Sequence, residues 1–334
     1  MEKQFHMDMK LKAVLSIAVF AFVFLPISTQ AQLRTDSQDQ NIELGKVSWY
    51  RNYQEALALS GQTNKPVLIL FQEVPGCMTC QRYGTNVLSH PLMVEVIENE
   101  FVPLVVFNNK GDADRKVLNH YNEPSWNNPV VRIVDQKGED IVKRVSGNYT
   151  ALGLMEAMAT AKLKRKESIP GYMRVLGEEL KAKTHASVEE ANYQMYCFWS
   201  GEGHLGQANG VVATEPGFMN GHEVVRVWYD ENVISKKELD SYAVKASCQP
   251  VAGTGKFRPD RDPQYYLKHS PYRYLPLTPL QRSRINSALG HRESADEFLS
   301  PTQLKWLQAV RKDDKGMDLL YTEDFVTAWE SVGL

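Results

Sequence analysis

The chain lacks features that would assign it to several large functional classes. Its 38 Lys+Arg against 40 Asp+Glu give a net charge of -2, so the basic excess typical of nucleic-acid-binding proteins is absent. Four cysteines in 334 residues are too few for a disulfide-rich scaffold. After residue 31, no apolar run is long enough to cross a bilayer. We therefore expect a globular protein with no nucleic-acid partner and no stable membrane insertion after its leader is removed.

The N-terminus has the pattern of a secretory leader. Two lysines precede an apolar run from Ala13 to Ile27, and the small residues Thr29 and Ala31 follow at the offsets that a signal peptidase reads. An uncleaved anchor is the alternative, but the run is short for a span of about 20 apolar residues. We expect residues 1–31 to be a signal peptide and the mature protein to be exported, either periplasmic or secreted.

The remaining length predicts two domains, at roughly 100–200 residues per domain. After a flexible segment, 32–46, residues 47–163 alternate short apolar runs with helical patterns, which predicts an α/β domain. Residues 164–189 are expected to form a linker with a bridging helix. Residues 190–334 predict a second domain with strands followed by capped helices. The strands of the first domain are expected at 67–71, 101–107, 130–134 and 141–145.

Cys77 and Cys80 have C-x-x-C spacing between a buried strand and a predicted helix. A thiol at a helix N-terminus is favoured as thiolate by the macrodipole, and the second thiol is within reach to resolve a mixed disulfide. A structural zinc site needs four ligands, and His90 is a lone candidate beside this pair. A purely structural disulfide is the other alternative, since export favours oxidation. The pattern predicts a redox pair with no metal and no cofactor.

Residues 47–163 resemble a thioredoxin fold, with Trp49, the C-x-x-C, and Pro129 ahead of a strand. The resemblance implies that Pro129 is a cis-proline that faces the redox pair and helps to bind substrate. Residues 74–80, Val-Pro-Gly-Cys-Met-Thr-Cys, are similar to the VPGU-x-T subgroup, in which selenocysteine can stand where Cys77 stands. The resemblance to this selenoprotein subgroup implies that Cys77 is the attacking atom and leaves reductase or oxidase direction open.

Cys197 follows a strand-like segment and precedes two aromatic residues, and core packing is one interpretation, since free cysteine is often buried. Residues 196–202 resemble Gly-Cys-Phe-Trp-Gly-x-Glu of type A peptide methionine sulfoxide reductases, with Tyr196 and Ser200 as departures. Residues 221–230 resemble that family's His-Ala-Glu block without the alanine. The likeness covers about residues 190–285. It implies an α+β domain with a ferredoxin-like core.

This second resemblance also implies roles. Cys197 is the nucleophile that attacks the sulfoxide sulfur, and Glu223 is the acid that protonates the leaving oxygen. Tyr272 is the hydroxyl partner of that acid, with Tyr265 and Tyr266 as rival assignments.

Two aromatic residues and one further cysteine complete the candidate site. Phe198 and Trp199 form the apolar wall for the substrate's methyl group. Cys248 is either a resolving thiol or a buried small residue. The family's segment with another active-site tyrosine is missing, because Gly217 to Gly221 run directly into His222.

The two cysteine pairs lead to competing hypotheses for an oxidoreductase acting on sulfur groups. The first is a methionine sulfoxide reductase of the peptide-methionine (S)-S-oxide type, with electrons relayed from the C-x-x-C and supplied by an external thiol reductant. The second is a protein disulfide reductase or exchange protein whose C-terminal domain binds oxidised client proteins without catalysis. Reduction of another oxidised small molecule and a purely structural role are the third and fourth.

Overall fold

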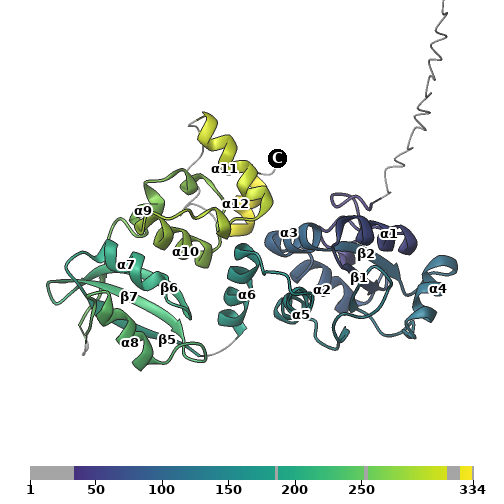
Figure 1. The fold of residues 1–334 in the computed structure, drawn as a ribbon, viewed down its shortest axis with the longest axis horizontal. Coiled ribbons are helices and arrows are strands. Elements are labelled where there is room, and N and C mark those ends of the chain that lie inside the picture. Colours follow the sequence, from purple (N-terminus) through teal and green to yellow (C-terminus); the bar gives the residue numbers. More distant parts are fainter. Residues whose placement is uncertain (1–33, 185–186, 252–254, 314–323, 333–334) are drawn as a thin grey trace, which may run out of the picture. The chain divides into compact units, whose positions relative to one another are not determined.

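The computed structural model describes residues 34–184, 187–251, 255–313 and 324–332 (Figure 1). The predicted signal peptide lies outside the described residues. Across the described ranges, every helix is too short or too polar to span a bilayer.

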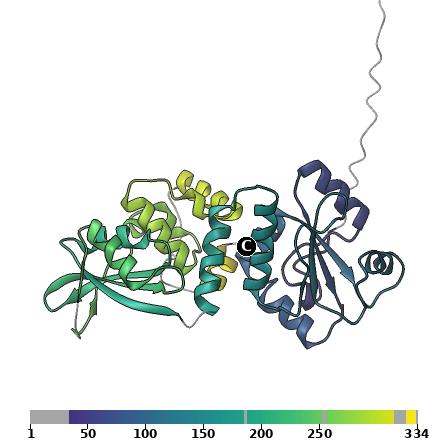
Figure 2. The same cartoon turned by 60° about the horizontal axis from the view of Figure 1, so that its bottom comes forward.

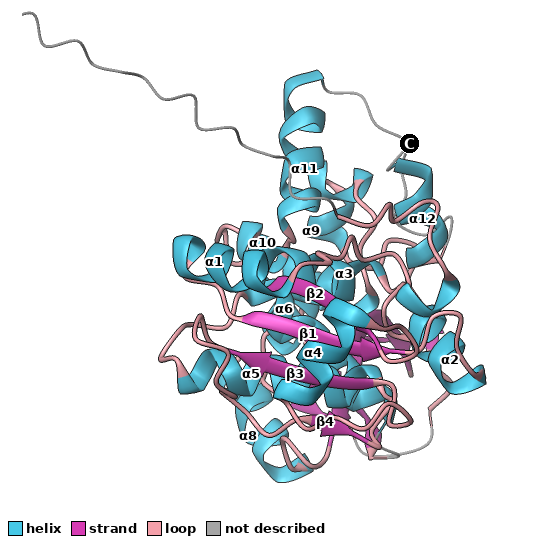
Figure 3. Cartoon of the chain, turned by 90° about the vertical axis from the view of Figure 1, so that its right-hand side faces the viewer, coloured by secondary structure: helices cyan, strands magenta, loops and turns pink. Residues whose placement is uncertain are grey.

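The first domain is built on a four-stranded sheet in the order β2-β1-β3-β4 (Figure 3). β1 pairs parallel with β2, and β3 is antiparallel to both β1 and β4. All six residues of β1 are buried, as its continuous apolar run predicts for a strand covered on both faces. The strands are β1 (Val67–Gln72), β2 (Val102–Phe107), β3 (Val130–Val134) and β4 (Val145–Ser146).

Helices cover both faces of this sheet. Leu68 and Leu70 of β1 pack into one core with residues of α2, α3 and α5, while Ile69 and Phe71 pack into the other with residues of α1 and α4. This division follows the period of two along a strand. The sheet order and the helices confirm the predicted thioredoxin-like α/β fold. The helices are α1 (Tyr53–Thr63), α2 (Met78–Asn86), α3 (Pro91–Glu100), α4 (Asp112–His120) and α5 (Ala151–Lys164).

Two elements of this domain differ from expectation. The predicted strand at 141–145 is reduced to β4, because Val131 pairs with Val145 and Val134 bridges Asp140. Two extra residues on the later segment must therefore bulge out of the ladder. The helix α4 was not expected, since its sequence is polar except for a short apolar face that packs against β2.

The second domain has a five-stranded antiparallel sheet in the order β8-β5-β7-β6-β9, and its long β6–β7 hairpin is visible at the left of Figure 2. The element order β5-α7-β6-β7-α8-β8 with this strand order is the ferredoxin-like arrangement, which confirms the predicted α+β core. The elements are β5 (Val188–Gln194), α7 (Phe198–Gly206), β6 (Val211–Met219), β7 (His222–Asp230), α8 (Lys236–Lys245), β8 (Gln249–Pro250) and β9 (Arg258–Pro259).

Helices follow the second sheet, as the capping signals predict. Thr278 and Gln281 bond reciprocally at one helix start, and Ser300 and Gln303 do so at another. The elements are α9 (Tyr265–Lys268), the 3₁₀ helix η2 (Pro271–Tyr274), α10 (Pro279–Gly290), η3 (Asp296–Phe298), α11 (Pro301–Asp313) and α12 (Phe325–Val332).

The segment between the sheets is packed rather than loose. The helix α6 (Gly171–Thr184) contacts α3 and α5 as well as α10 and β6. Lys162 of α5, just before the expected linker, is buried with its Nζ 2.7 Å from a Glu100 oxygen and 3.3 Å from a Glu167 oxygen. Buried ion pairs of this kind fix the position of a segment even where their net energy is small.

Candidate functional site: two thiol centres

Cys77 and Cys80 lie together at the start of α2. Cys77 is the N-cap and is exposed, Cys80 is buried, and their sulfur atoms are 3.8 Å apart. The thiol of Cys80 donates a hydrogen bond of 2.8 Å to Oδ1 of Asn128. Asn128 precedes Pro129 in a cis peptide bond, which agrees with the expectation for the thioredoxin-like fold. The structure therefore brings three of the predicted residues to one place.

The two thiols have opposite electrostatic environments. The backbone N–H groups of Cys80 and Thr79 lower the pKa of Cys77, because they stabilise its thiolate. Burial raises the pKa of Cys80 to about 12, and the negative charge of Glu73 adds to the rise. Cys77 is thus the thiol that is both accessible and more readily ionised, which suits the attacking role.

Two acidic residues near this pair were not found by sequence reasoning. A carboxylate oxygen of Glu73 and the two sulfur atoms lie within 4.8 Å of one another. Three ligand atoms are fewer than the four of a structural zinc site. Glu43 is buried and accepts a hydrogen bond of 2.7 Å from the N–H of Gly76. Neither residue belongs to the C-x-x-C motif, and Glu43 comes from the 3₁₀ helix Ile42–Leu44, so only the fold brings them there.

Cys197 occupies the N-cap of α7, so the predicted strand ends three residues earlier, at Gln194. Glu223 of β7 lies at the same helix start, where its carboxylate accepts a hydrogen bond of 2.8 Å from the N–H of Phe198. Phe198 is buried, and its ring centroid is 5.5 Å from that of Trp199. The structure therefore brings the predicted nucleophile, acid and aromatic pair to one helix start.

The three candidate tyrosines lie in different surroundings. Tyr272 is buried and donates a hydrogen bond of 2.5 Å to Asp296, and burial raises its pKa to about 12. Its hydroxyl is thus engaged by the C-terminal helices rather than aimed at the Cys197 helix. The two rivals lie against that helix instead: Tyr265 stacks on Trp199 with ring centroids 4.2 Å apart, and the hydroxyl of Tyr266 is 3.4 Å from that of Ser200.

Cys248 is buried, as one of its two alternative descriptions expects. It is buried in the core with Phe198, and burial raises its pKa to about 11. It also directly precedes β8, whose Gln249 pairs with Gln194, three residues before Cys197. The register places Cys248 beside the segment that leads to Cys197.

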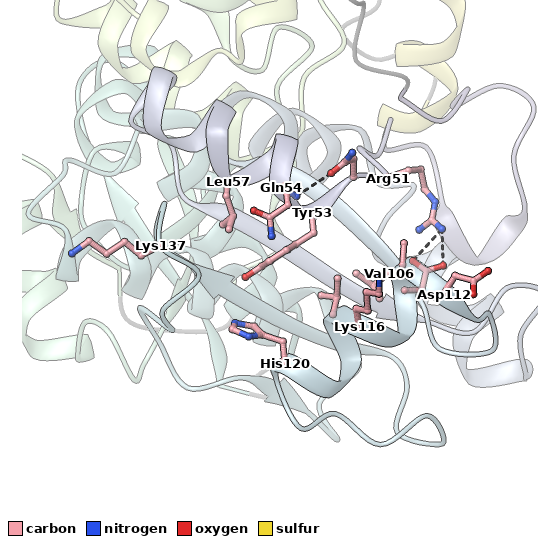
Figure 4. Close-up of a pocket in the computed structure, with 13 residues that line it drawn as sticks. Arg51, Tyr53, Gln54, Leu57, Val106, Asp112, Lys116, His120 and Lys137 are labelled. Atoms are coloured by element: carbon pink, nitrogen blue, oxygen red, sulfur yellow. Dashed lines mark hydrogen bonds and ion pairs between the residues drawn. The ribbon is translucent and has the colours of Figure 1, made fainter.

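A cavity of about 780 Å³ lies elsewhere, between α1 and α4 of the first domain (Figure 4). Its lining includes Tyr53, Lys116 and His120, and an ion pair between Arg51 and Asp114 of 2.9 Å crosses one side. None of its lining residues is a cysteine, so it is separate from the thiol chemistry.

The fold and the first thiol pair define a thioredoxin-like domain joined to a second domain with two cysteines of its own. A family model described as thioredoxin-like matches residues 48–136. The chain is also similar to peptide methionine sulfoxide reductase MsrA of Clostridium perfringens, with 43% identity over 60 residues, or 13% of this chain and 38% of that protein. It is 30% identical over 105 residues to MsrA 1 of a Nostoc species, covering 26% of this chain and 63% of that protein.

The chain thus spans less than two thirds of these reductases. A solved structure, described as DsbH oxidoreductase, covers 38% of this chain and 92% of its own, at 20% identity and a TM-score of 0.31. The findings show a thioredoxin-like domain and a partial similarity to MsrA.

The asymmetry of the first pair makes a direct prediction. We expect iodoacetamide to alkylate Cys77 faster than Cys80 in the reduced protein at neutral pH, because burial keeps Cys80 protonated. Peptide mapping by mass spectrometry after short exposures measures both rates. The Cys77→Ser and Cys80→Ser variants are the matched controls. Faster labelling of Cys80 would reverse the assignment of the attacking thiol.

Proposed function

We propose that this protein is an exported thiol–disulfide oxidoreductase that reduces methionine sulfoxide at Cys197 with electrons from Cys77 and Cys80. The observation that carries the proposal is the position of Glu223. Its carboxyl group binds the first turn of the helix that Cys197 begins, next to the aromatic pair of Phe198 and Trp199. A nucleophilic sulfur, an acid and an apolar wall are the groups that the reaction needs.

The chemistry proceeds in two-electron steps. The Cys197 thiolate attacks the sulfoxide sulfur, and Glu223 protonates the oxygen. The oxygen passes to Cys197 as sulfenic acid, and the thioether is released. The thiol of Cys248 then condenses with the sulfenic acid, which forms a disulfide and releases water. Cys77 attacks this disulfide, Cys80 resolves the mixed disulfide, and an external thiol reductant restores the C-x-x-C.

Exchange with client proteins is the second candidate, and one observation favours it. Met78, next to Cys77, is 60% exposed, and Trp126, just before the cis-proline segment, is 79% exposed. Exposed apolar side chains beside a reactive thiol can bind an unfolded or oxidised polypeptide. In this case Cys77 and Cys80 act on the client, and the second domain binds it.

A direct assay separates these candidates. We expect the reduced wild-type protein to convert methionine sulfoxide, free or in a peptide, to methionine, with the product measured by chromatography. Cys197→Ser should abolish turnover, because no nucleophile remains. Glu223→Gln should slow it by about 10²–10⁴-fold, the usual contribution of general acid catalysis. A wild type without turnover of methionine sulfoxide would favour the client-exchange function, and turnover that survives in Cys197→Ser would remove Cys197 from the reaction.

A mixing experiment tests the relay between the two thiol pairs. With a donor that reduces only the C-x-x-C, the Cys77→Ser/Cys80→Ser double variant and the Cys197→Ser variant should each be inactive alone. Recovery of turnover in the mixture, rising with concentration, indicates transfer between molecules. Inactivity of the mixture beside an active wild type indicates transfer within one chain, where tethering raises the effective thiol concentration. An active double variant on its own would exclude the relay.

Export is checked by the mass of the mature chain. We expect protein made in a Gram-negative host to begin at Gln32, after removal of residues 1–31, and to be recovered in the periplasmic fraction. Intact-mass spectrometry of that fraction measures the cleavage site. Retention of Met1, or recovery with the cytoplasmic fraction, contradicts this expectation.

A further inference from the structure

Glu202 is a buried carboxylic acid that the proposed reaction leaves without a role. It lies in α7, five residues after Cys197, and is 1% exposed. Glu202 lies about one and a half helical turns beyond the N-cap. It is therefore not on the side of the first helical turn, where Glu223 accepts the N–H of Phe198. A carboxyl group so completely removed from water is costly unless its oxygens are bonded.

Both oxygens of Glu202 have partners from other elements. Oε2 accepts a hydrogen bond of 2.9 Å from the backbone N–H of Gln264, and the hydroxyl of Thr214 on β6 is 3.4 Å from Oε1. Gln264 is the N-cap of α9 and has φ 54° and ψ 48°. A left-handed conformation is uncommon for a non-glycine residue and persists where its surroundings hold it.

The helix that begins after this turn carries the two tyrosines that contact the Cys197 helix. Tyr265 stacks on Trp199 with an interplanar angle of 19°. Tyr266 approaches Ser200 with its hydroxyl. Because α9 has four residues, a change at its N-cap moves all of its side chains. Leu267 provides a second anchor, since its N–H donates to Asn286 at 3.1 Å.

We propose that Glu202 is a positioning residue, whose buried carboxyl group holds the turn at Gln264 and thereby sets Tyr265 against Trp199. The inference depends on the proposed function, in which Trp199 belongs to the wall that receives the substrate. Glu202 acts through the turn and the tyrosine, not on the reacting atoms. Tyr265 then completes the aromatic wall and determines how tightly the methyl group of the substrate is enclosed.

The charge state of Glu202 gives this role a pH signature. Burial raises its pKa to about 8, and the negative charge of Asp260 adds to the rise, while donors from Gln264, Thr214 and Asn286 oppose it. The carboxyl group is therefore neutral at pH 7, and a glutamine can reproduce its acceptor oxygen. Titratable side chains on elements packed against α7 include Glu215 of β6, Glu223 of β7, Tyr242 of α8, Arg284 of α10 and the α10 C-cap residue His291.

The sign of the stability effect follows from the raised pKa. The folded state binds a proton that the unfolded state loses near its ordinary value, so the contribution of Glu202 to stability falls as pH rises through about 8. Glutamine does not ionise. The midpoint of thermal unfolding of Glu202→Gln should therefore rise relative to that of the wild type as pH increases from about 5 to about 9.

Two variants and a control test the proposal. Glu202→Gln keeps an acceptor for Gln264, Glu202→Leu removes it, and Thr214→Val removes only the contact with Oε1. Hydrogen exchange of peptides that cover residues 262–268, followed by mass spectrometry, reports whether the turn is held. We expect faster exchange in Glu202→Leu and wild-type exchange in Glu202→Gln and Thr214→Val.

Kinetics on methionine sulfoxide provide the second readout. We expect kcat/KM of Glu202→Leu to fall about tenfold, mainly through KM, as when one buried donor loses its partner. Glu202→Gln should stay within about threefold of the wild type at pH 7. Equal losses in both variants, or unchanged exchange in Glu202→Leu, would overturn the positioning role. A wild type without any turnover would defeat the proposed function, whereas the exchange experiment would still decide whether Glu202 holds the turn.

Discussion

Both candidate thiol sites depend on one constraint, a cysteine at the N-terminal end of a helix. The first-turn N–H groups of a helix have no partner within the helix and favour negative charge. At α2 these groups act on Cys77 itself and lower its pKa. At α7 the N–H of Phe198 is bonded to Glu223 instead. The same local geometry therefore favours the thiolate of Cys77 in one domain and binds a carboxyl group at the start of the Cys197 helix in the other.

The two cysteines of each pair differ in burial. Cys80 and Cys248 are both buried and have raised pKa values, so each remains a thiol near neutral pH. Cys77 is exposed and Cys197 is half-buried. A disulfide exchange chain requires that the accessible thiol attack first and that the protected thiol resolve later. The differences in burial are the ones that this order requires in each pair.

The elements that the sequence predicted well are those with strong local signals. The apolar run of β1, the capping boxes and the C-x-x-C each depend on residues close together in the chain. Tyr272 was preferred over Tyr265 because a motif does not say which hydroxyl another helix will engage, and here Asp296 takes that of Tyr272.

The residues that were missed are also those placed by long-range packing. Glu202 stands in the same motif as Cys197, but its role depends on a turn 62 residues later in the chain. Glu43 reaches the redox pair from a segment that was expected to be flexible. The polar helix α4 depends on a narrow apolar face and on contacts with β2. A local sequence pattern does not predict contacts between residues that are this far apart in the chain.

The packed boundary between the two sheets bears on the proposed relay of electrons. Arg284 is buried, donates to Glu178 of α6 at 2.9 Å, and also donates to the carbonyl of Gly206 at the end of α7. Lys162 holds the other side of the boundary to Glu100. A tether raises effective concentration only when it lets both sites meet. The Arg284–Glu178 pair ties α6 to α10, whereas the Lys162–Glu100 pair ties α5 to α3. In the proposed relay, the exposed Cys77 of one copy can approach the second domain of another copy with these contacts intact.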